Sequence, residues 1–101
     1  MLKMAIRSYR DKGTRDIAAG INSKPARRKL PVDLHDLARR RLAFLTAARS
    51  LDDLRAWPGL NLHALQRERY GQYAVRINDQ YRICFAWTAG DADAVEIADY
   101  H

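Results

Sequence analysis

The sequence has few of the residues that build disulfide, metal or nucleotide frameworks. Among 101 residues Cys84 is the only cysteine, which excludes an internal disulfide. There is no CxxC pair, HExxH, GxGxxG or Walker loop. No apolar run approaches the roughly twenty residues that span a bilayer, and MLKMAIRSYRDKG lacks the core of a signal peptide. We therefore expect one cytoplasmic domain over 1–101, without disulfide, metal, cofactor or membrane, and with Cys84 packed in a sheet.

Negative charge is scarce in the first half of the chain. Residues 1–50 hold 13 Lys and Arg against 4 Asp and Glu, a net of +9, whereas residues 51–101 hold 5 against 8, a net of −3. A basic half concentrates anionic partners and speeds their encounter. One basic cluster consists of Lys24, Arg27, Arg28 and Lys29. It fits either a solvated surface or a nucleic-acid contact.

The stretch from Gly71 to Trp87 alternates apolar and polar residues with a period of two, which predicts two strands joined at Asn78-Asp79. A two-residue loop would place Arg82 on the apolar face, because a slip by one residue turns every side chain over. A three-residue loop, 78–80, keeps that face apolar. The pairs that it predicts are Ile77 with Tyr81, Val75 with Ile83, and Tyr73 with Phe85.

The three-residue loop also places Arg76 opposite Arg82 on the other face of the sheet. Like charges directly opposite each other repel. Either both guanidinium groups are solvated, or an anion binds between them. We expect this face to stay open and concave through the sheet's twist.

The remaining patterns predict a small α+β fold, an antiparallel sheet with two helices of the N-terminal half packed on one face. An apolar stripe marks the longer helix, with Asp33 as its N-cap and His35 off the stripe without a role. The stripe contains Leu34, Leu37, Ala38, Leu42 and Leu45. In the first half of the chain the predicted elements are a strand over 2–7, a helix over 12–19 ending at Gly20, a loop over 22–25 and a helix from about 31 to 49–50. In the second half they are a turn over 51–54, a short strand near 62, the hairpin, and a strand over 94–98.

The residues suited to chemistry point to RNA, which carries its own nucleophile, the 2′-hydroxyl. Cleavage then needs a base, an acid for the 5′-oxygen, and a cation on the phosphate. His63 and His101 titrate near neutral pH, and Arg82 offers a planar cation. Asp99 could orient a histidine, and Tyr100 could stack on a base or donate a proton. Without further evidence, a C-terminal Tyr-His is simply a frayed end.

Three stretches resemble the HigB toxins of toxin–antitoxin systems, in the RelE superfamily: IRSYRDKGTRDI, LHALQRERYGQYAVRINDQYRICFAW and the terminal DYH. The resemblance spans nearly the whole chain and implies a RelE-like compact fold. It implies a metal-independent, ribosome-dependent endoribonuclease, an mRNA interferase that cuts mRNA in the ribosomal A site and inhibits translation. It also implies a HigA-like helix-turn-helix antitoxin, through which alone the protein reaches DNA. The active-site candidates carried over are His63, Arg82, Asp99, Tyr100 and His101.

The chain departs from the family pattern after the histidine. Many relatives read LKG there, with an RNA-contacting lysine, whereas this chain has Leu65, Gln66 and Arg67. Gln66 offers no full charge, so Arg67, Arg69 and Arg76 complete the predicted RNA-binding set. Two alternatives stay open: a catalytically weak or inactive binding module that docks a DNA-binding antitoxin in autoregulation, and a stand-alone RNA-binding domain.

Overall fold

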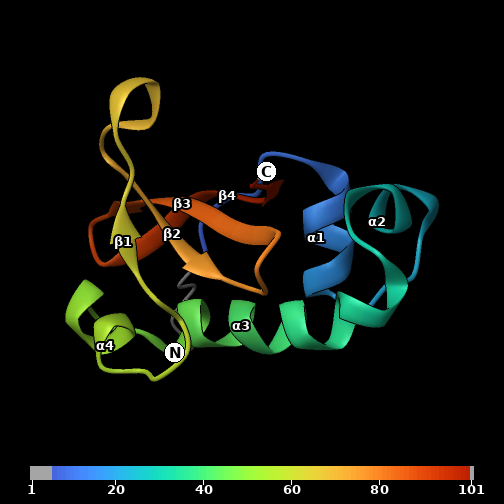
Figure 1. The fold of residues 1–101 in the computed structure, drawn as a ribbon, viewed down its shortest axis with the longest axis horizontal. Helices are drawn as coiled ribbons and strands as arrows, with labels where there is room; N and C mark the ends of the chain where they lie inside the picture. The colour runs from blue at the N-terminus through green and yellow to red at the C-terminus, as the bar shows by residue number, and fades with distance from the viewer. Residues whose placement is uncertain (1–5, 101) are drawn as a thin grey trace.

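A four-stranded antiparallel sheet forms the middle of the molecule in the computed structural model, which describes residues 6–100 (Figure 1). The strand order follows the chain, β1-β2-β3-β4. The strands are β1 (His63–Ala64), β2 (Gln72–Arg76), β3 (Tyr81–Thr88) and β4 (Asp91–Asp99). The predicted α+β class is confirmed, and the last strand is longer than the 94–98 that alternation indicated.

The β2–β3 hairpin has the predicted register. Val75 lies opposite Ile83 and Arg76 opposite Arg82, so the connection contains three residues, 78–80. The side chain of Asn78 closes this turn, because its Oδ1 accepts hydrogen bonds from the main-chain N–H groups of Gln80 and Tyr81 at 3.0 and 2.8 Å. Asparagine favours turns through such side-chain to main-chain bonds.

Four α-helices pack around this sheet. They are α1 (Lys12–Ala18), α2 (Lys24–Lys29), α3 (His35–Ala47) and α4 (Leu51–Arg55), with short 3-10 turns η1 (Val32–Leu34) and η2 (Arg67–Arg69). In Figure 1, α3 runs along one side of the sheet and α1 stands at its end beside α2. The two predicted helices correspond to α1 and α3, and the turn predicted over 51–54 is helix α4, capped by Ser50. Within the described residues, no helix has both the length and the apolar character needed to cross a bilayer.

The predicted loop over 22–25 was wrong, because α2 begins inside it. Ser23 is the N-cap and accepts a hydrogen bond from Ala26 N at 3.2 Å, while Pro25 occupies the first turn. Proline is favoured there because its missing N–H has no helical partner to lose. Only Ala26 of this helix is buried, so the segment carries no apolar periodicity to reveal it.

The start of the long helix also differs from the prediction. Asp33 is not an N-cap, because the chain enters α3 through η1 without any side-chain cap. His35 is buried rather than on the surface, and its Nε2 lies 2.8 Å from the carbonyl oxygen of Leu30. This contact ties the segment after α2 to the first turn of α3.

The N-terminal segment lies along β4. The strand predicted over 2–7 falls mostly outside the described residues, but Ile6 and Tyr9 form isolated parallel bridges with Ala92 and Val95. Helix α1 is docked on the same strand by Thr14, whose buried hydroxyl accepts a hydrogen bond from Ile97 N at 3.1 Å. Residues 6–14 therefore cover the free edge and one face of β4.

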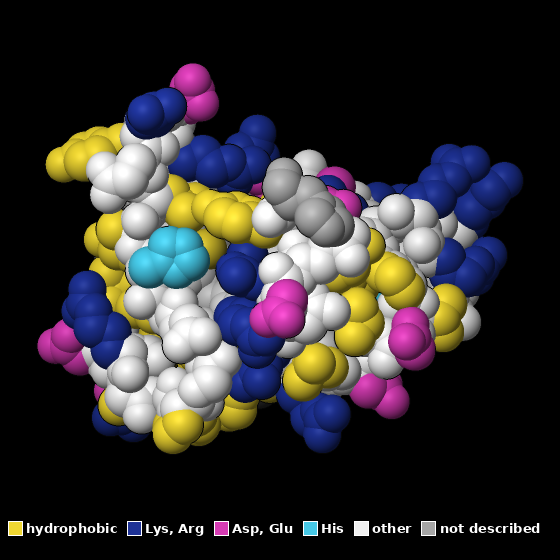
Figure 2. Space-filling model, in the orientation of Figure 1, with side chains coloured by type: hydrophobic (Ala, Val, Ile, Leu, Met, Phe, Trp, Pro, Cys, Tyr) yellow, Lys and Arg dark blue, Asp and Glu magenta, His cyan; other side chains and the backbone are white. Residues whose placement is uncertain are grey.

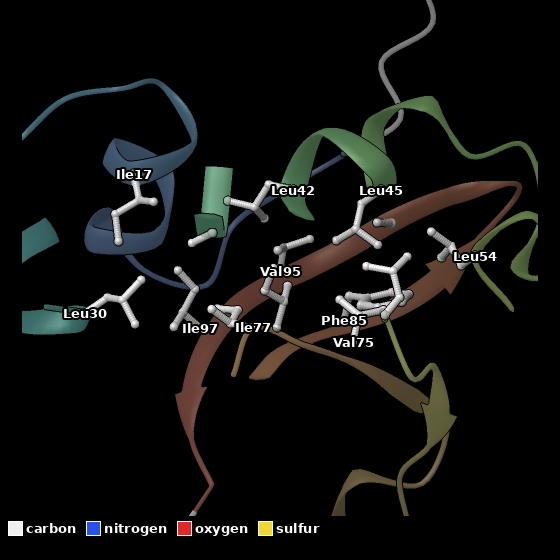
Figure 3. Packing of buried hydrophobic residues seen from close by; sticks show 14 of the residues in the cluster. Ile17, Leu30, Leu42, Leu45, Leu54, Val75, Ile77, Phe85, Val95 and Ile97 are labelled. Carbon is white, nitrogen blue, oxygen red and sulfur yellow. The ribbon is translucent and has the colours of Figure 1, made fainter. Parts of the chain in front are cut away.

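The core lies between the helices and one face of the sheet (Figure 3). Leu42 and Leu45 of α3 and Ile17 of α1 point toward the strands, as the stripe on the long helix predicted. The largest fully buried sheet side chains are Val75, Ile83, Phe85, Val95 and Ile97. Among the described residues, none of the four α-helices contributes to the apolar cluster on the opposite face of the hairpin.

Removing the Asn78 side chain should destabilise the hairpin. In Asn78→Ala, two main-chain N–H groups lose their acceptor, so we expect the free energy of unfolding to fall by about 1–3 kcal/mol. Asn78→Asp keeps an acceptor oxygen and should lose less. Urea unfolding of the three proteins measures this, and equal stability of Asn78→Ala and the parent would contradict it.

Asp16 should make the fold sensitive to acid. It accepts hydrogen bonds from Ser23 Oγ at 2.6 Å and Lys12 Nζ at 2.9 Å, and the bond from Ser23 is the main reason its pKa lies below the ordinary value. A depressed pKa stabilises the fold above the unfolded-state pKa, and this contribution is lost as pH falls. The free energy of unfolding, measured from neutral to acid pH, should therefore fall less steeply for Asp16→Asn than for the parent. The matched variant Asp33→Asn, at an exposed position, should keep the parent's slope, and parallel curves for all three would refute the assignment.

Candidate functional site

The face of the sheet turned away from the helices has an apolar floor and a charged rim. Strand alternation directs Ala74, Arg76, Arg82 and Cys84 to this side. Leu65, Ala74, Cys84 and Ala98 form a small second cluster on it. Cys84 is fully buried, as predicted, and burial raises the pKa of its thiol, so it stays protonated and inert.

Arg82 is held at this face by main-chain carbonyls. Its Nη1 donates to the carbonyl oxygens of Asn78 and Tyr81, the latter at 3.2 Å. Its Cζ lies 5.5 Å from the centroid of the Tyr100 ring, within cation–π range. Carbonyl partners fix the guanidinium without cancelling its charge, and between residues 6 and 100 it makes no ion pair. This leaves a positioned cation beside an exposed aromatic ring.

Arg76, directly opposite, is compensated. Its guanidinium forms an ion pair with Asp79 in the turn, and this hydrogen bond holds the pKa of Asp79 below its ordinary value. Arg82 adds a smaller effect of the same sign on Asp79. The two arginines therefore differ: Arg76 has a local carboxylate, and Arg82 has none among the described residues. Whether an anion binds between them stays a prediction.

Arg69 fastens the β1–β2 connection onto the sheet. Its Nη2 donates to Glu96 Oε1 of β4 at 2.6 Å and its Nη1 to Gln72 Oε1 at 3.1 Å. The Glu96 carboxylate raises the pKa of Arg69, and Arg10 approaches the same carboxylate at 3.8 Å. Arg69 thus crosses the open face as a structural tie. No local sequence pattern indicates this tie, because Glu96 lies 27 residues from Arg69.

The rest of this connection projects from the body of the molecule (Figure 1). Gln66 and Arg67 are exposed, and Arg67 has φ +57, the left-handed region that glycine favours. This left-handed φ fits the glycine that the resemblance described above predicts at this position. Tyr70, which the sequence analysis did not select, has 84% of its surface exposed at the end of this projection.

The remaining predicted residues lie at different distances from Arg82. His63 is exposed on the edge strand β1, opposite Ala74, with Nδ1 3.1 Å from the carbonyl oxygen of Asn61. Asp99 is paired with Tyr81 and receives a hydrogen bond from Gln80 Nε2 at 3.1 Å. Alternation along β4 directs Asp99 and Tyr100 to opposite sides. His101 lies outside the described residues. The structure thus joins Arg82 with Tyr100 and leaves His63 one strand beyond Arg76.

Three further observations complete the description of the site. Tyr100 is held by its main chain, because its N–H donates to the Gln80 carbonyl oxygen at 2.6 Å. No group of three or more His, Cys, Asp or Glu side chains that could hold a metal ion occurs in the part of the chain that the structure describes. Figure 2 shows Lys and Arg side chains in a band down the middle of one view, beside an exposed histidine.

Replacing Arg76 should raise the pKa of Asp79. In Arg76→Gln the hydrogen bond and charge that lower this pKa are both weakened, so the pKa should rise toward its ordinary value while staying slightly low because of Arg82. Carboxyl NMR titration measures it. Arg55→Gln, which removes a charge paired with Asp52 instead, should leave Asp79 unchanged. An Asp79 pKa that is the same in both variants would rule out the ion pair as its cause.

Comparison with known proteins places the chain in a family. The family model described as RelE-like toxin of type II toxin–antitoxin system HigB matches residues 7–101. Toxin HigB-1 of Vibrio cholerae serotype O1 is 35% identical over 65 residues, covering 64% of this chain and 68% of that protein. An uncharacterised protein of Haemophilus influenzae is 30% identical over 59 residues, 58% of each chain. Because the family model covers nearly the whole sequence, this protein belongs to the HigB-like toxins of type II toxin–antitoxin systems.

Proposed function

We propose that this protein is a ribosome-dependent mRNA endoribonuclease that inhibits translation and acts without a metal ion. The observation that carries the proposal is the Arg82 guanidinium, fixed by carbonyl groups and unneutralised within the described residues. Membership in a toxin family supports a toxic activity, and the open face supports a phosphate ligand. RNA supplies the nucleophile itself, so the protein needs only proton transfer and charge stabilisation.

In the proposed reaction, a general base takes the proton of the ribose 2′-hydroxyl. The 2′-oxygen bonds to phosphorus while the bond from phosphorus to the 5′-oxygen breaks, and a general acid protonates that leaving oxygen. The products are a 2′,3′-cyclic phosphate and a 5′-hydroxyl. Arg82 would stabilise the charge that grows on the phosphate. Tyr100, stacked near Arg82, would hold a base or orient the nucleotide.

The proton transfers are assigned to the histidines. His101, assisted by Asp99, or else His63, would act as the base, with the other as the acid. The exposure of His63 on the edge strand leaves it free to reach a substrate on the open face. Its main-chain contact to Asn61 leaves Nε2 available.

The RNA-binding residues divide by how much charge they offer. Arg67 is exposed and makes no ion pair among residues 6–100, so it can meet phosphate directly. Gln66 beside it can only donate neutral hydrogen bonds. Arg69 and Arg76 are held by Glu96 and Asp79, so a phosphate would have to compete with those carboxylates.

A type II toxin implies an antitoxin partner. We propose a HigA-like helix-turn-helix antitoxin, through which the toxin would reach DNA, and a cytoplasmic ribosome as the place of action. The basic surface of α2 would contact ribosomal RNA. Figure 2 shows Lys and Arg side chains at the edge of the molecule where Figure 1 places α2.

One observation favours a rival function. The position where relatives carry a lysine is the neutral, exposed Gln66, and loss of one phosphate cation lowers transition-state stabilisation. A protein weakened in this way would still dock its antitoxin and take part in autoregulation. Gln66→Lys would raise RNA cleavage if this position limits activity.

Induced expression tests the proposal. The intact chain should stop growth and translated mRNAs should be cut, whereas a chain lacking His101 should be inert. Arg82→Gln should lower the rate of mRNA cleavage by roughly 100-fold or more, the loss seen when one preorganised donor to a developing charge is removed. Growth curves and mapped transcript ends measure both effects.

Arg15→Gln, an equal charge change at an exposed position on α1, serves as the control and should remain toxic. Binding of each variant to the antitoxin shows that it is folded. If the intact chain is harmless and leaves mRNA whole yet still binds the antitoxin, the protein is a binding module and the nuclease proposal fails.

A further inference from the structure

A basic pocket with an aromatic wall lies on α3, away from the predicted active-site residues. It has a volume of about 260 Å³ and is lined by Leu37, Arg40, Arg41 and Phe44. Three arginines follow one another on this helix, but only the first is neutralised: Arg39 pairs with Asp36. Arg40 and Arg41 make no ion pair with any described residue.

Arg41 is the unusual member of the pocket. Its Nε is buried and has no hydrogen-bond partner among the described residues. A buried donor without an acceptor costs free energy, and a charged one costs more. Its two terminal nitrogens lie 3.7 and 3.8 Å from the position that a Cβ atom would take on Gly59. The guanidinium is therefore positioned by packing rather than by an anion of the protein itself.

An exposed aromatic ring stands beside these cations. The ring of Trp57 lies 4.2 Å from that of Phe44, centroid to centroid, tilted by 42°. Although Phe44 supports it, Trp57 remains 40% exposed. Exposed aromatic rings next to arginines form the stacking platforms on which proteins bind single-stranded nucleic acid.

A loop links this pocket to strand β2. The loop from Trp57 to Leu60 connects them, because the Leu60 carbonyl oxygen accepts a hydrogen bond from Arg76 N at 2.7 Å. The Arg41 guanidinium lies beside the same loop, 3.7 Å from the position that a Cβ atom would take on Gly59. Backbone dimensions therefore put the distance from the Arg41 guanidinium to the main chain of Arg76 on the order of 10 Å. The band of Lys and Arg side chains in Figure 2 runs down toward α3.

We propose that this α3 pocket is a second RNA subsite, which holds the backbone and one base of the strand whose scissile phosphate lies at Arg82. Arg40 and Arg41 bind a phosphate, and Trp57 stacks on the adjoining base. The inference rests on the proposed function, since it extends the same RNA strand past Arg76 at the end of β2. It gives the enzyme a grip on RNA outside the residues that perform the reaction.

RNA fits these features better than an acidic protein segment does. A carboxylate would pair with the arginines, but it would not stack on the flat, exposed indole beside them. A nucleotide brings both groups, a phosphate for the guanidinium groups and a base for the ring. An acidic segment of the antitoxin is accordingly the alternative that the test must distinguish.

Binding of 2′-O-methylated RNA, which cannot be cut through its 2′-oxygen, tests the subsite. The probe is a labelled oligonucleotide of about ten nucleotides, within the span that single-strand binding proteins cover. Arg40→Gln and Arg41→Gln should each weaken binding by roughly three- to tenfold and lower the salt slope by about 0.7, the value for one phosphate on a single strand. RNA should also quench tryptophan emission, and Trp57→Phe should abolish the quenching, since Trp87 is the only other tryptophan.

Arg7→Gln, the same charge change at an arginine paired with Asp91, is the control and should bind RNA like the parent. The subsite is refuted if Arg40→Gln and Arg41→Gln match Arg7→Gln, if the intact chain binds no oligonucleotide, or if both variants lose antitoxin binding and keep RNA binding. Arg82→Gln separates the two proposals. Weakened binding in that variant alone would leave the proposed function standing and remove only the subsite.

Discussion

The hydrogen bonds of Asn78 are the constraint on which the site depends. Its side chain caps the main-chain N–H groups of Gln80 and Tyr81, which fixes a three-residue turn. Its own carbonyl oxygen then accepts from Arg82, and the carbonyl of Gln80 in the same turn accepts from Tyr100 N. One turn residue therefore sets the strand register and places the cation, and its neighbour places the ring. A change of turn length would move Arg82 to the core face.

The arginines of the open face differ in what holds them. Arg69 and Arg76 are each held by a carboxylate, and these pairs keep the β1–β2 connection and the hairpin turn in place. Arg82 is held instead by carbonyl oxygens, whose partial charges orient a guanidinium without neutralising it. Preorganised charge stabilises a transition state best where it is not already paired. This difference is why the proposed function assigns the phosphate to Arg82 rather than to Arg69 or Arg76.

Local sequence patterns predicted the hairpin well because burial on one face leaves a period of two that few registers satisfy. Burial on one face also made the long helix predictable, because it leaves the apolar stripe that includes Leu42 and Leu45. Helix α2 was missed because it buries only Ala26 and depends on capping by Ser23, which periodicity does not report. The burial of His35 was missed because it depends on the Leu30 carbonyl, brought close by the turn before α3.

Contacts distant in sequence decide the rest of the site, and no local pattern contains them. The tie from Arg69 to Glu96 joins the β1–β2 connection to β4, and the approach of Arg41 to Gly59 joins a helix to a loop. Both contacts concern arginines that sequence alone describes only as basic. Whether an arginine is a tie, a paired surface charge or an anion ligand depends on the acceptors around it. In this chain Arg39 is paired with Asp36, whereas the buried Nε of Arg41, two residues later on the same helix, has no partner among the described residues.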